Sequence, residues 1–157
     1  MFNAFLDPQT AELPEPDLDG NALAHRIIKQ RDCDTTYLRA LVLTGVDMDS
    51  EEVKNGKGYR PLHVATLFTR LDMVRFLLEQ TNVPVNTEDA NKHTPLWHAI
   101  KTLGASEAKM SIVELLLAHG GDKAPEPTNN CFEHRLNKLF KKYKFKKIKG
   151  TDLYCRR

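Results

Sequence analysis

The sequence predicts an all-α fold, a solenoid of about three helix–turn–helix repeats with a C-terminal capping helix. Two observations predict it. Pairs of helical patterns alternate with extended polar loops over residues 21–123, and within them Pro61-Leu62 recurs 34 residues later as Pro95-Leu96. Ala65 recurs at the same offset as Ala99. A period of about 33 to 34 residues with one helix pair per unit is typical of a repeat array, whose stacked units bury a continuous core.

Composition and hydrophobic spacing divide the chain into five segments. We expect an acidic, proline-containing N-terminal arm over residues 1–20, a degenerate first repeat over 21–50, a second repeat over 51–88, a third repeat over 89–123, and a basic C-terminal capping helix and tail over 124–157. The degenerate repeat is included because helical spacing runs from about residue 21 to 30 and again from 35 to 44, across a short polar turn.

The third repeat carries an insertion between its two helices. The extra residues lie within LGASEAKM, residues 103–110. Lengthening such a turn costs little loop entropy. The insertion is therefore either a longer helix or relaxed loop at the edge of the array, or a protrusion that contacts a partner.

Charge separates an acidic body from a basic C-terminal segment. Residues 1–130 hold 13 Lys or Arg against 19 Asp or Glu, whereas residues 131–157 hold ten against two. This asymmetry indicates an anionic partner or an internal contact. No apolar stretch reaches the roughly 18 residues of a membrane-spanning helix, so we expect no transmembrane segment.

Cysteine usage and the N-terminus indicate a reducing, cytoplasmic location. Cys33, Cys131 and Cys155 are odd in number and widely spaced, which disfavours a disulfide framework. The first 20 residues lack the basic and apolar regions of a standard secretory signal. A zinc site built from Cys131-x-x-His134 and closed by Cys155 lacks a clear fourth ligand, and we do not expect one.

Two histidines flank Thr-Pro-Leu-Trp in KHTPLWHAI, residues 92–100. Histidine is a common metal ligand and catalytic base, but Thr94 is placed to cap a helix that begins at Pro95. His93 then precedes the helix, His98 lies inside it, and no acidic or cysteine partner stands at metal-ligand spacing. We therefore expect neither a metal site nor a catalytic site here. No nucleophile–base pair, phosphate-binding loop or metal-ligand cluster appears, which argues against an enzyme, and we expect no cofactor.

Two motif copies carry a family resemblance. The first is GYRPLHVA (58–65) followed by MVRFLLE (73–79), and the second is DANKHTPLWHA (89–99) followed by IVELLL (112–117) and GGD (120–122). Together they resemble the ankyrin-repeat family, whose pattern is roughly Asp-x-x-Gly-x-Thr-Pro-Leu-His-x-Ala, then Ile-Val-x-Leu-Leu-Leu and Gly-Ala-Asp. The resemblance covers about residues 21–123. It implies that His63, at the motif histidine, hydrogen-bonds the backbone of a neighbouring loop.

Three residues depart from the family pattern. Arg60 replaces the usual Thr, so the hydroxyl cap of that helix is absent. Lys92 replaces Gly, which costs roughly 1 kcal/mol if the turn keeps a positive φ. Trp97 stands at the motif histidine, and we expect its indole to fill space between adjacent loops.

The resemblance implies that the function is partner recognition. Ankyrin proteins bind on a concave face made by the loop tips and the exposed side of each first helix. We expect a non-catalytic protein–protein interaction module of this kind, with another protein as partner and no small-molecule substrate. By position, the partner-binding residues are Lys57, Tyr59, Leu67, Phe68, Asn91, His93, Lys101 and Thr102.

Tyr59, Leu67 and Phe68 are the most informative of these residues, because nothing in the repeat core requires them and aromatic anchors dominate interface energetics. The alternative is packing of Tyr59 or Phe68 against the N-terminal arm or the degenerate first repeat. Simple scaffolding, regulation of an enzyme and an effector role all stay open. Small divergent ankyrin proteins resemble stand-alone modules of intracellular bacteria and their hosts, so delivery into a host cell without a signal peptide also stays open.

The C-terminal segment predicts a capping helix. Its apolar residues form one helical stripe, and a repeat array must end in a unit that is apolar inside and polar outside. The stripe consists of Phe132, Leu136, Leu139, Phe140 and Tyr143. The lysines exceed what solubility needs, which indicates an alternative function, the binding of nucleic acid or acidic phospholipid. The anion-binding residues of that alternative are Lys141, Lys142, Lys144, Lys146, Lys147 and Lys149.

Overall fold

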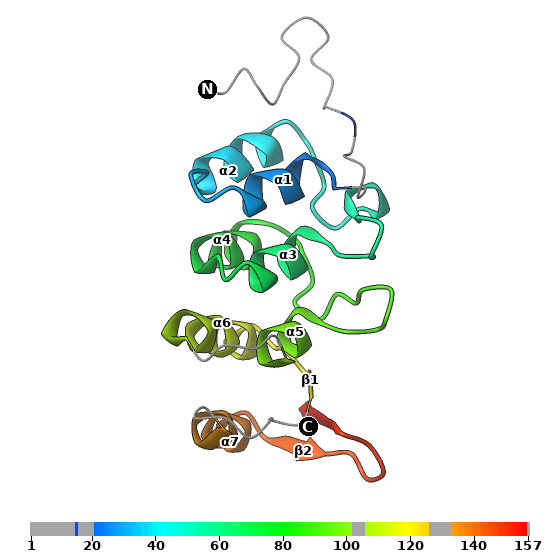
Figure 1. Ribbon diagram of the computed structural model, residues 1–157, viewed down its shortest axis with the longest axis vertical. Coiled ribbons are helices and arrows are strands. Elements are labelled where there is room, and N and C mark those ends of the chain that lie inside the picture. Colours follow the sequence, from blue (N-terminus) through cyan, green and yellow to red (C-terminus); the bar gives the residue numbers. More distant parts are fainter. Residues whose placement is uncertain (1–14, 16–20, 102–105, 126–132, 157) are drawn as a thin grey trace, which may run out of the picture.

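The computed structural model describes residues 15, 21–101, 106–125 and 133–156. Over these residues the protein is a stack of helix pairs along its long axis, with loops projecting from one side (Figure 1). The predicted all-α solenoid is confirmed, and three short strands are added near its C-terminal end. The N-terminal arm lies outside the described residues, apart from the exposed Glu15.

Three helix pairs form most of the stack. The pairs are α1 (Leu23–Lys29) with α2 (Thr35–Leu43), α3 (Pro61–Leu67) with α4 (Leu71–Gln80), and α5 (Pro95–Lys101) with α6 (Glu107–Ala118). The first helices lie against one another in the order α1, α3, α5, and the second helices in the order α2, α4, α6. Each pair therefore buries apolar surface against the next, which is how a repeat array builds one continuous core.

The core repeats with the helices. Leu62, Leu77, Leu96 and Leu116 are fully buried, and each contributes roughly 1.5–3 kcal/mol relative to an exposed side chain. Ala65 in α3 is also fully buried. Because its side chain is a single methyl group, the neighbouring first helices approach closely at this position.

The start of α5 follows the motif residues. Thr94 Oγ1 accepts a hydrogen bond from the Trp97 amide at 3.3 Å, and Pro95 takes the first helical position, as predicted. The Thr94 hydroxyl also donates to the Lys123 carbonyl at 3.1 Å. One side chain therefore caps the helix and ties it to the strand β1 (Lys123–Pro125).

A repeated histidine contact joins each first helix to the following loop. His25 Nε2 in α1 lies 2.8 Å from the Tyr59 carbonyl oxygen, and His63 Nε2 in α3 lies 3.2 Å from the His93 carbonyl oxygen. Tyr59 and His93 occupy equivalent positions, each one residue before the N-cap of a first helix. The structural role predicted for His63 is confirmed. His25 has the same role in the degenerate repeat, where no motif identified it.

Part of the insertion in the third repeat is helix. Ser106 is the N-cap of α6, and its hydroxyl accepts a hydrogen bond from the Lys109 amide at 3.3 Å. Residues 107–110 therefore belong to α6, which has 12 residues against 10 in α4. This agrees with the alternative of a longer helix. Residues 102–105 lie outside the described residues.

The C-terminal segment corrects the predicted helix and tail. The helix α7 (Glu133–Lys142) is present, but the chain after it forms β2 (Phe145–Lys147) and β3 (Leu153–Arg156). These strands pair antiparallel with each other, and β3 also pairs antiparallel with β1, giving the order β1-β3-β2. Lys144 adopts a φ of 61°, which ends the helix.

Aromatic packing explains why the tail folds back. Phe145 stacks on Phe140 with ring centroids 4.9 Å apart, and Tyr154 lies 5.3 Å from Phe140. The apolar stripe of α7 therefore packs on the sheet through Phe140, and Leu136 and Phe140 are buried as predicted. Phe132 lies outside the described residues.

None of the helices in the described part of the chain combines the length and the apolar character that a membrane span requires.

Candidate functional site

The residues predicted to bind a partner lie in the two loops before α3 and α5 and at the C-terminal ends of these two helices. We call this surface the loop face. Four of the predicted residues are exposed, namely Lys57, Phe68, Asn91 and Lys101, and three are half-buried, namely Tyr59, Leu67 and His93. Thr102 lies outside the described residues. Phe68 is the C-cap of α3 and has 51% of its surface exposed, although phenylalanine is among the residue types most often buried.

Tyr59 is part of the packing between repeats, which corrects the prediction that the core does not require it. Its ring stacks on His63 with centroids 5.8 Å apart and meets the edge of His98 at 5.3 Å. Its carbonyl contacts His25 of the first repeat. Burial, with a smaller effect from the charge of Asp89, raises the pKa of the Tyr59 phenol, so the side chain is neutral and apolar in character.

Trp97, which replaces the motif histidine, packs against residues of its own repeat, and the placement of its indole between adjacent loops stays a prediction. Its indole stacks on the His93 imidazole with centroids 3.6 Å apart and planes 8° from parallel, and it meets the His98 ring edge-on at 5.2 Å. The side chain is half-buried. The stack fixes the loop that precedes α5 against that helix.

Asp89 is the residue that the sequence analysis did not connect with the histidines. Its Oδ2 lies 2.8 Å from His98 Nε2 and 3.8 Å from His93 Nδ1, so an acidic partner does stand next to both histidines. Its Oδ1 accepts from the Asn91 amide at 2.7 Å and from the His93 amide at 2.9 Å. The spacing Asp89-x-x-x-His93-x-x-x-x-His98 was visible in the sequence, but Asp89 was assigned to the loop motif alone.

Protonation of this cluster follows from its surroundings. Burial opposes ionisation of Asp89, but hydrogen bonds from the His93 amide, the His98 ring and the Asn91 amide outweigh it and lower the pKa of the carboxyl group. Burial also lowers the pKa of His98, although the neighbouring carboxylate acts in the opposite direction. Near pH 7 the cluster therefore contains a carboxylate beside a neutral imidazole.

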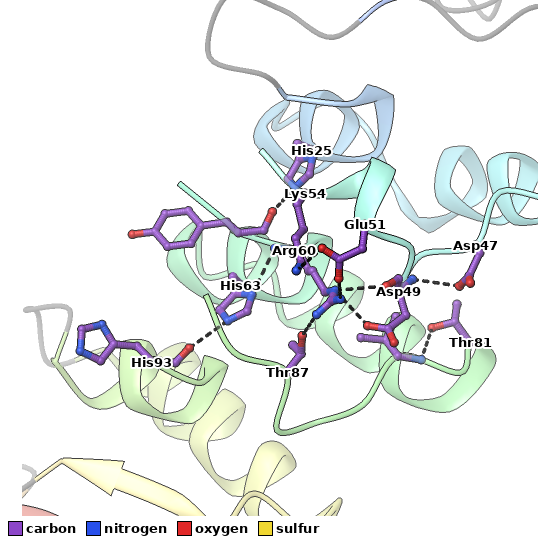
Figure 2. A network of polar contacts seen from close by, with 12 residues as sticks. His25, Asp47, Asp49, Glu51, Lys54, Arg60, His63, Thr81, Thr87 and His93 are labelled. Atoms are coloured by element: carbon purple, nitrogen blue, oxygen red, sulfur yellow. Dashed lines mark hydrogen bonds and ion pairs between the residues drawn. The ribbon is translucent and has the colours of Figure 1, made fainter. Parts of the chain in front are cut away.

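Arg60 joins two successive loops (Figure 2). Its Nε lies 3.0 Å from Asp49 Oδ1, its Nη2 donates to Glu51 Oε1 at 2.9 Å, and its Nη1 donates to Thr87 Oγ1 at 2.7 Å. The expected absence of a hydroxyl cap is confirmed, and the Arg60 amide donates to His63 Nδ1 at 3.2 Å instead. The departure from the motif therefore adds an inter-loop connection, which sequence reasoning did not foresee.

Lys92 has the conformation that the resemblance predicted. Its φ is 64°, in the left-handed region that favours glycine. The Asp89 amide donates to the His93 carbonyl at 3.0 Å across this turn. The strain at Lys92 is thus held in place by the hydrogen bonds that close the loop.

The lysines of the alternative function are all exposed. Lys141 and Lys142 lie in the last turn of α7, and Lys144 follows that helix. Lys146 and Lys147 lie in β2, and Lys149 lies in the turn before β3. They belong to one C-terminal unit, on a different part of the molecule from the loop face (Figure 1). Cys131 lies outside the described residues, so a zinc site with His134 and Cys155 stays untested.

The most exposed large apolar side chain among the described residues was not predicted to be exposed. Leu43 ends α2 with 81% of its surface exposed. It lies outside the helical stripe of Leu38, Leu41 and Val42, which is the signal that could have identified it. As it ends a second helix, it does not belong to the loop face.

Comparison with known proteins identifies the repeats. The sequence matches the family model for ankyrin repeats, as three copies, over residues 24–127. It is 37% identical over 71 residues to the FYVE zinc finger domain protein UPA1 of Mycosarcoma maydis, covering 45% of this chain and 5% of that protein. It is 32% identical over 87 residues to Alpha-latrocrustotoxin-Lt1a of Latrodectus tredecimguttatus, covering 55% of this chain and 6% of that protein. The matches thus span a small fraction of either relative.

Proposed function

Because this chain belongs to the ankyrin-repeat family, we propose that it is a non-catalytic module that docks a partner protein on its loop face. Ankyrin repeats are generally protein–protein interaction modules. The observation that carries the choice of face is Phe68, a half-exposed aromatic side chain at the C-terminal end of α3. The exposed Lys101 ends the neighbouring helix α5, and the exposed Lys57 and Asn91 lie in the loops before the two helices. Aromatic residues surrounded by polar groups are typical anchors of protein interfaces.

Rigidity of the loop face supports the same proposal. Arg60 connects the two loops, and the contact of His63 with the His93 carbonyl joins α3 to the second loop (Figure 2). A surface held in one conformation loses less conformational entropy on binding than a mobile one. The face can therefore recruit or inhibit a partner without rearranging.

A paired comparison of variants tests this function. The face variant combines Phe68→Ser with Lys101→Glu. The control variant combines Leu43→Ser with Lys138→Glu, which makes the same chemical changes at exposed positions on α2 and α7. All four sites are exposed, so both variants are expected to fold, and circular dichroism and the melting temperature check this.

The readout is quantitative mass spectrometry of proteins captured from the native cell by each variant and by the unchanged protein. We expect at least one captured protein to be about tenfold depleted with the face variant and retained with the control. Equal recovery with both variants would place the interface elsewhere, and selective loss with the control would assign it to the second helices or the cap.

We further propose that the protein acts on its partner as an adaptor, an effector or a regulator of an enzyme. We also propose that it acts in a reducing, cytoplasmic location, which it reaches directly or by delivery into a host cell. Two free thiols agree with such a location, the buried Cys33 and the half-buried Cys155. Imaging of a fluorescent fusion in the native cell and in any host cell tests the location.

Anion binding by the C-terminal lysines is the second candidate, and the exposure of all six on one unit favours it. Because truncation after residue 143 would remove β2 and β3, substitution of the six lysines by glutamine is the better test. If anions bind here, affinity for DNA or for vesicles with acidic phospholipid falls steeply with salt and is lost in the glutamine variant. Flat affinity from low to high salt would exclude this candidate.

A further inference from the structure

Asp89, His93 and His98 bring three side chains that can bind metal close together at the start of α5. We call them the Asp–His–His cluster. Each residue offers one ligand atom, and these three atoms all lie within 4.8 Å of one another. The three residues come from one loop and the first turns of one helix, so the fold of a single repeat assembles the whole cluster.

A hydrogen-bonded Asp–His pair explains only part of this geometry. The distance of 2.8 Å between His98 Nε2 and Asp89 Oδ2 is an ordinary hydrogen bond. His93 Nδ1 faces the same carboxylate oxygen at 3.8 Å, which is too long for a hydrogen bond. The arrangement thus brings a second imidazole toward an oxygen that it does not reach.

The distances suit a metal ion shared by the three groups. Zinc binds imidazole nitrogen and carboxylate oxygen at about 2.0–2.2 Å, which places tetrahedral ligand atoms about 3.3 Å apart. The two distances to Asp89 Oδ2, 2.8 and 3.8 Å, lie on either side of that value. A change of about 0.5 Å in each of these two distances would bring the nitrogen and oxygen atoms to the spacing of zinc ligands.

Neighbouring groups hold the ligands in place. The Asn91 and His93 amides donate to Asp89 Oδ1 and leave Oδ2 directed at the histidines. Trp97 stacks on His93, and the His93 carbonyl accepts from the Asp89 amide. Such second-shell contacts orient ligands and raise metal affinity.

Access to the cluster is from the His93 side. The side chains of Asp89 and His98 are 0% and 7% exposed, whereas that of His93 is 32% exposed. An ion bound by the three side chains thus has solvent on one side, where water can complete a tetrahedral coordination sphere.

We propose that Asp89, His93 and His98 form a binding site for a divalent transition metal ion of the zinc type. Two imidazole nitrogens and one carboxylate oxygen are ligands that Zn²⁺ prefers. The ion links the loop before α5 to the helix itself and stabilises the folded state. The proposal is independent of partner docking, although the site borders the loop face.

The test uses the full chain after treatment with a chelator. Isothermal titration with Zn²⁺ is expected to show one ion per chain, and Co²⁺ is expected to give the visible absorption of a tetrahedral complex. The melting temperature is expected to rise with Zn²⁺. His93→Ala is the primary variant because His93 is partly exposed and its side chain is not needed to fill the core. We expect it to weaken Zn²⁺ binding at least tenfold.

His134→Ala is the matched control, since His134 is an exposed histidine on α7. It is expected to leave Zn²⁺ binding unchanged. NMR of the imidazole groups gives a readout that needs no variant, and the resonances of His93 and His98 are expected to shift on addition of Zn²⁺. The proposal is overturned if the unchanged protein binds no stoichiometric Zn²⁺, if His93→Ala binds it equally well, or if other histidines shift and these two do not.

Discussion

At the scale of single residues, Lys92 adopts a backbone conformation that is unfavourable for a residue other than glycine. Its φ of 64° costs a non-glycine residue roughly 1–2 kcal/mol in the folded state. A glycine would remove this strain, but it would also increase the conformational entropy of the unfolded chain, which offsets part of the gain in stability. We expect Lys92→Gly to raise the free energy of unfolding by about 0.5 kcal/mol. Urea denaturation measures it.

Asn91→Gly is the control for that prediction. Asn91 is an exposed neighbour in the same loop and is absent from the residues with positive φ. Glycine there relieves no strain and is expected to lower stability. If Asn91→Gly stabilises the protein as much as Lys92→Gly does, left-handed strain at Lys92 is not the cause.

The lowered pKa of His63 makes the free energy of unfolding depend on pH. Burial lowers its pKa from 6.5 to about 4. Between these values the unfolded chain binds a proton that the folded protein does not, so the free energy of unfolding falls as the pH decreases through this window. His63 alone is expected to account for about 3 kcal/mol, and the lowered pKa of His98 acts in the same direction.

Chemical denaturation at a series of pH values measures this dependence. His63→Gln keeps a donor for the His93 carbonyl but cannot titrate, so its slope between pH 6.5 and about 4 is expected to be smaller. An equal slope in the two proteins would show that other groups control the acid sensitivity.

At the scale of elements, Arg60 is the side chain that joins two loops. Its guanidinium is 13% exposed and contacts Asp49, Glu51 and Thr87. We expect Arg60→Ala to lower the free energy of unfolding by about 2 kcal/mol, since charge-assisted hydrogen bonds are lost and a polar hydroxyl is left without its donor. Thermal or urea denaturation measures the loss.

Arg75→Ala serves as the comparison, because Arg75 forms an exposed ion pair with Glu79 one helical turn away. Such pairs contribute about 0.5 kcal/mol or less. If the two substitutions cost the same, the contacts of Arg60 between loops do not hold the loop face together.

The features of the fold that depend on residues close together in the sequence could be predicted from the sequence. The helix pairs follow from apolar spacing, and Thr94 and Pro95 mark the start of α5, because capping depends on residues within one turn. The strands after α7 were not predicted, since β2 and β3 have three and four residues, too few to display an alternating pattern. The pairing of β3 with β1 depends on a chain segment about 30 residues away, as in Lys123 with Cys155.

In the candidate site, too, local features could be predicted from the sequence, whereas contacts between distant residues could not. Exposure of Phe68 and Lys101 followed from their place in the motif, whereas the packing of Tyr59 on His63 and His98 depends on how two repeats stack. The approach of Asp89 to both histidines depends on the turn at Lys92, which bends the loop back to α5. Contacts of this kind follow from three-dimensional arrangement and not from spacing along the chain.

At the scale of the whole molecule, the stack presents two distinct surfaces. The loop face follows the first helices, while the basic C-terminal unit caps the far end (Figure 1). In an array each unit contacts its neighbours alone, so each surface can change without disturbing the other. Partner docking and anion binding are therefore separable by experiment.

Amide hydrogen exchange of the protein with and without its captured partner tests partner docking on the loop face most directly. We predict slower exchange on binding in the two loops that precede α3 and α5, around Lys57 and Asn91, and in α3 and α5 themselves. Exchange in α2, α4 and α7 should stay unchanged. Protection confined to those three helices, with none in the loops, would contradict the account.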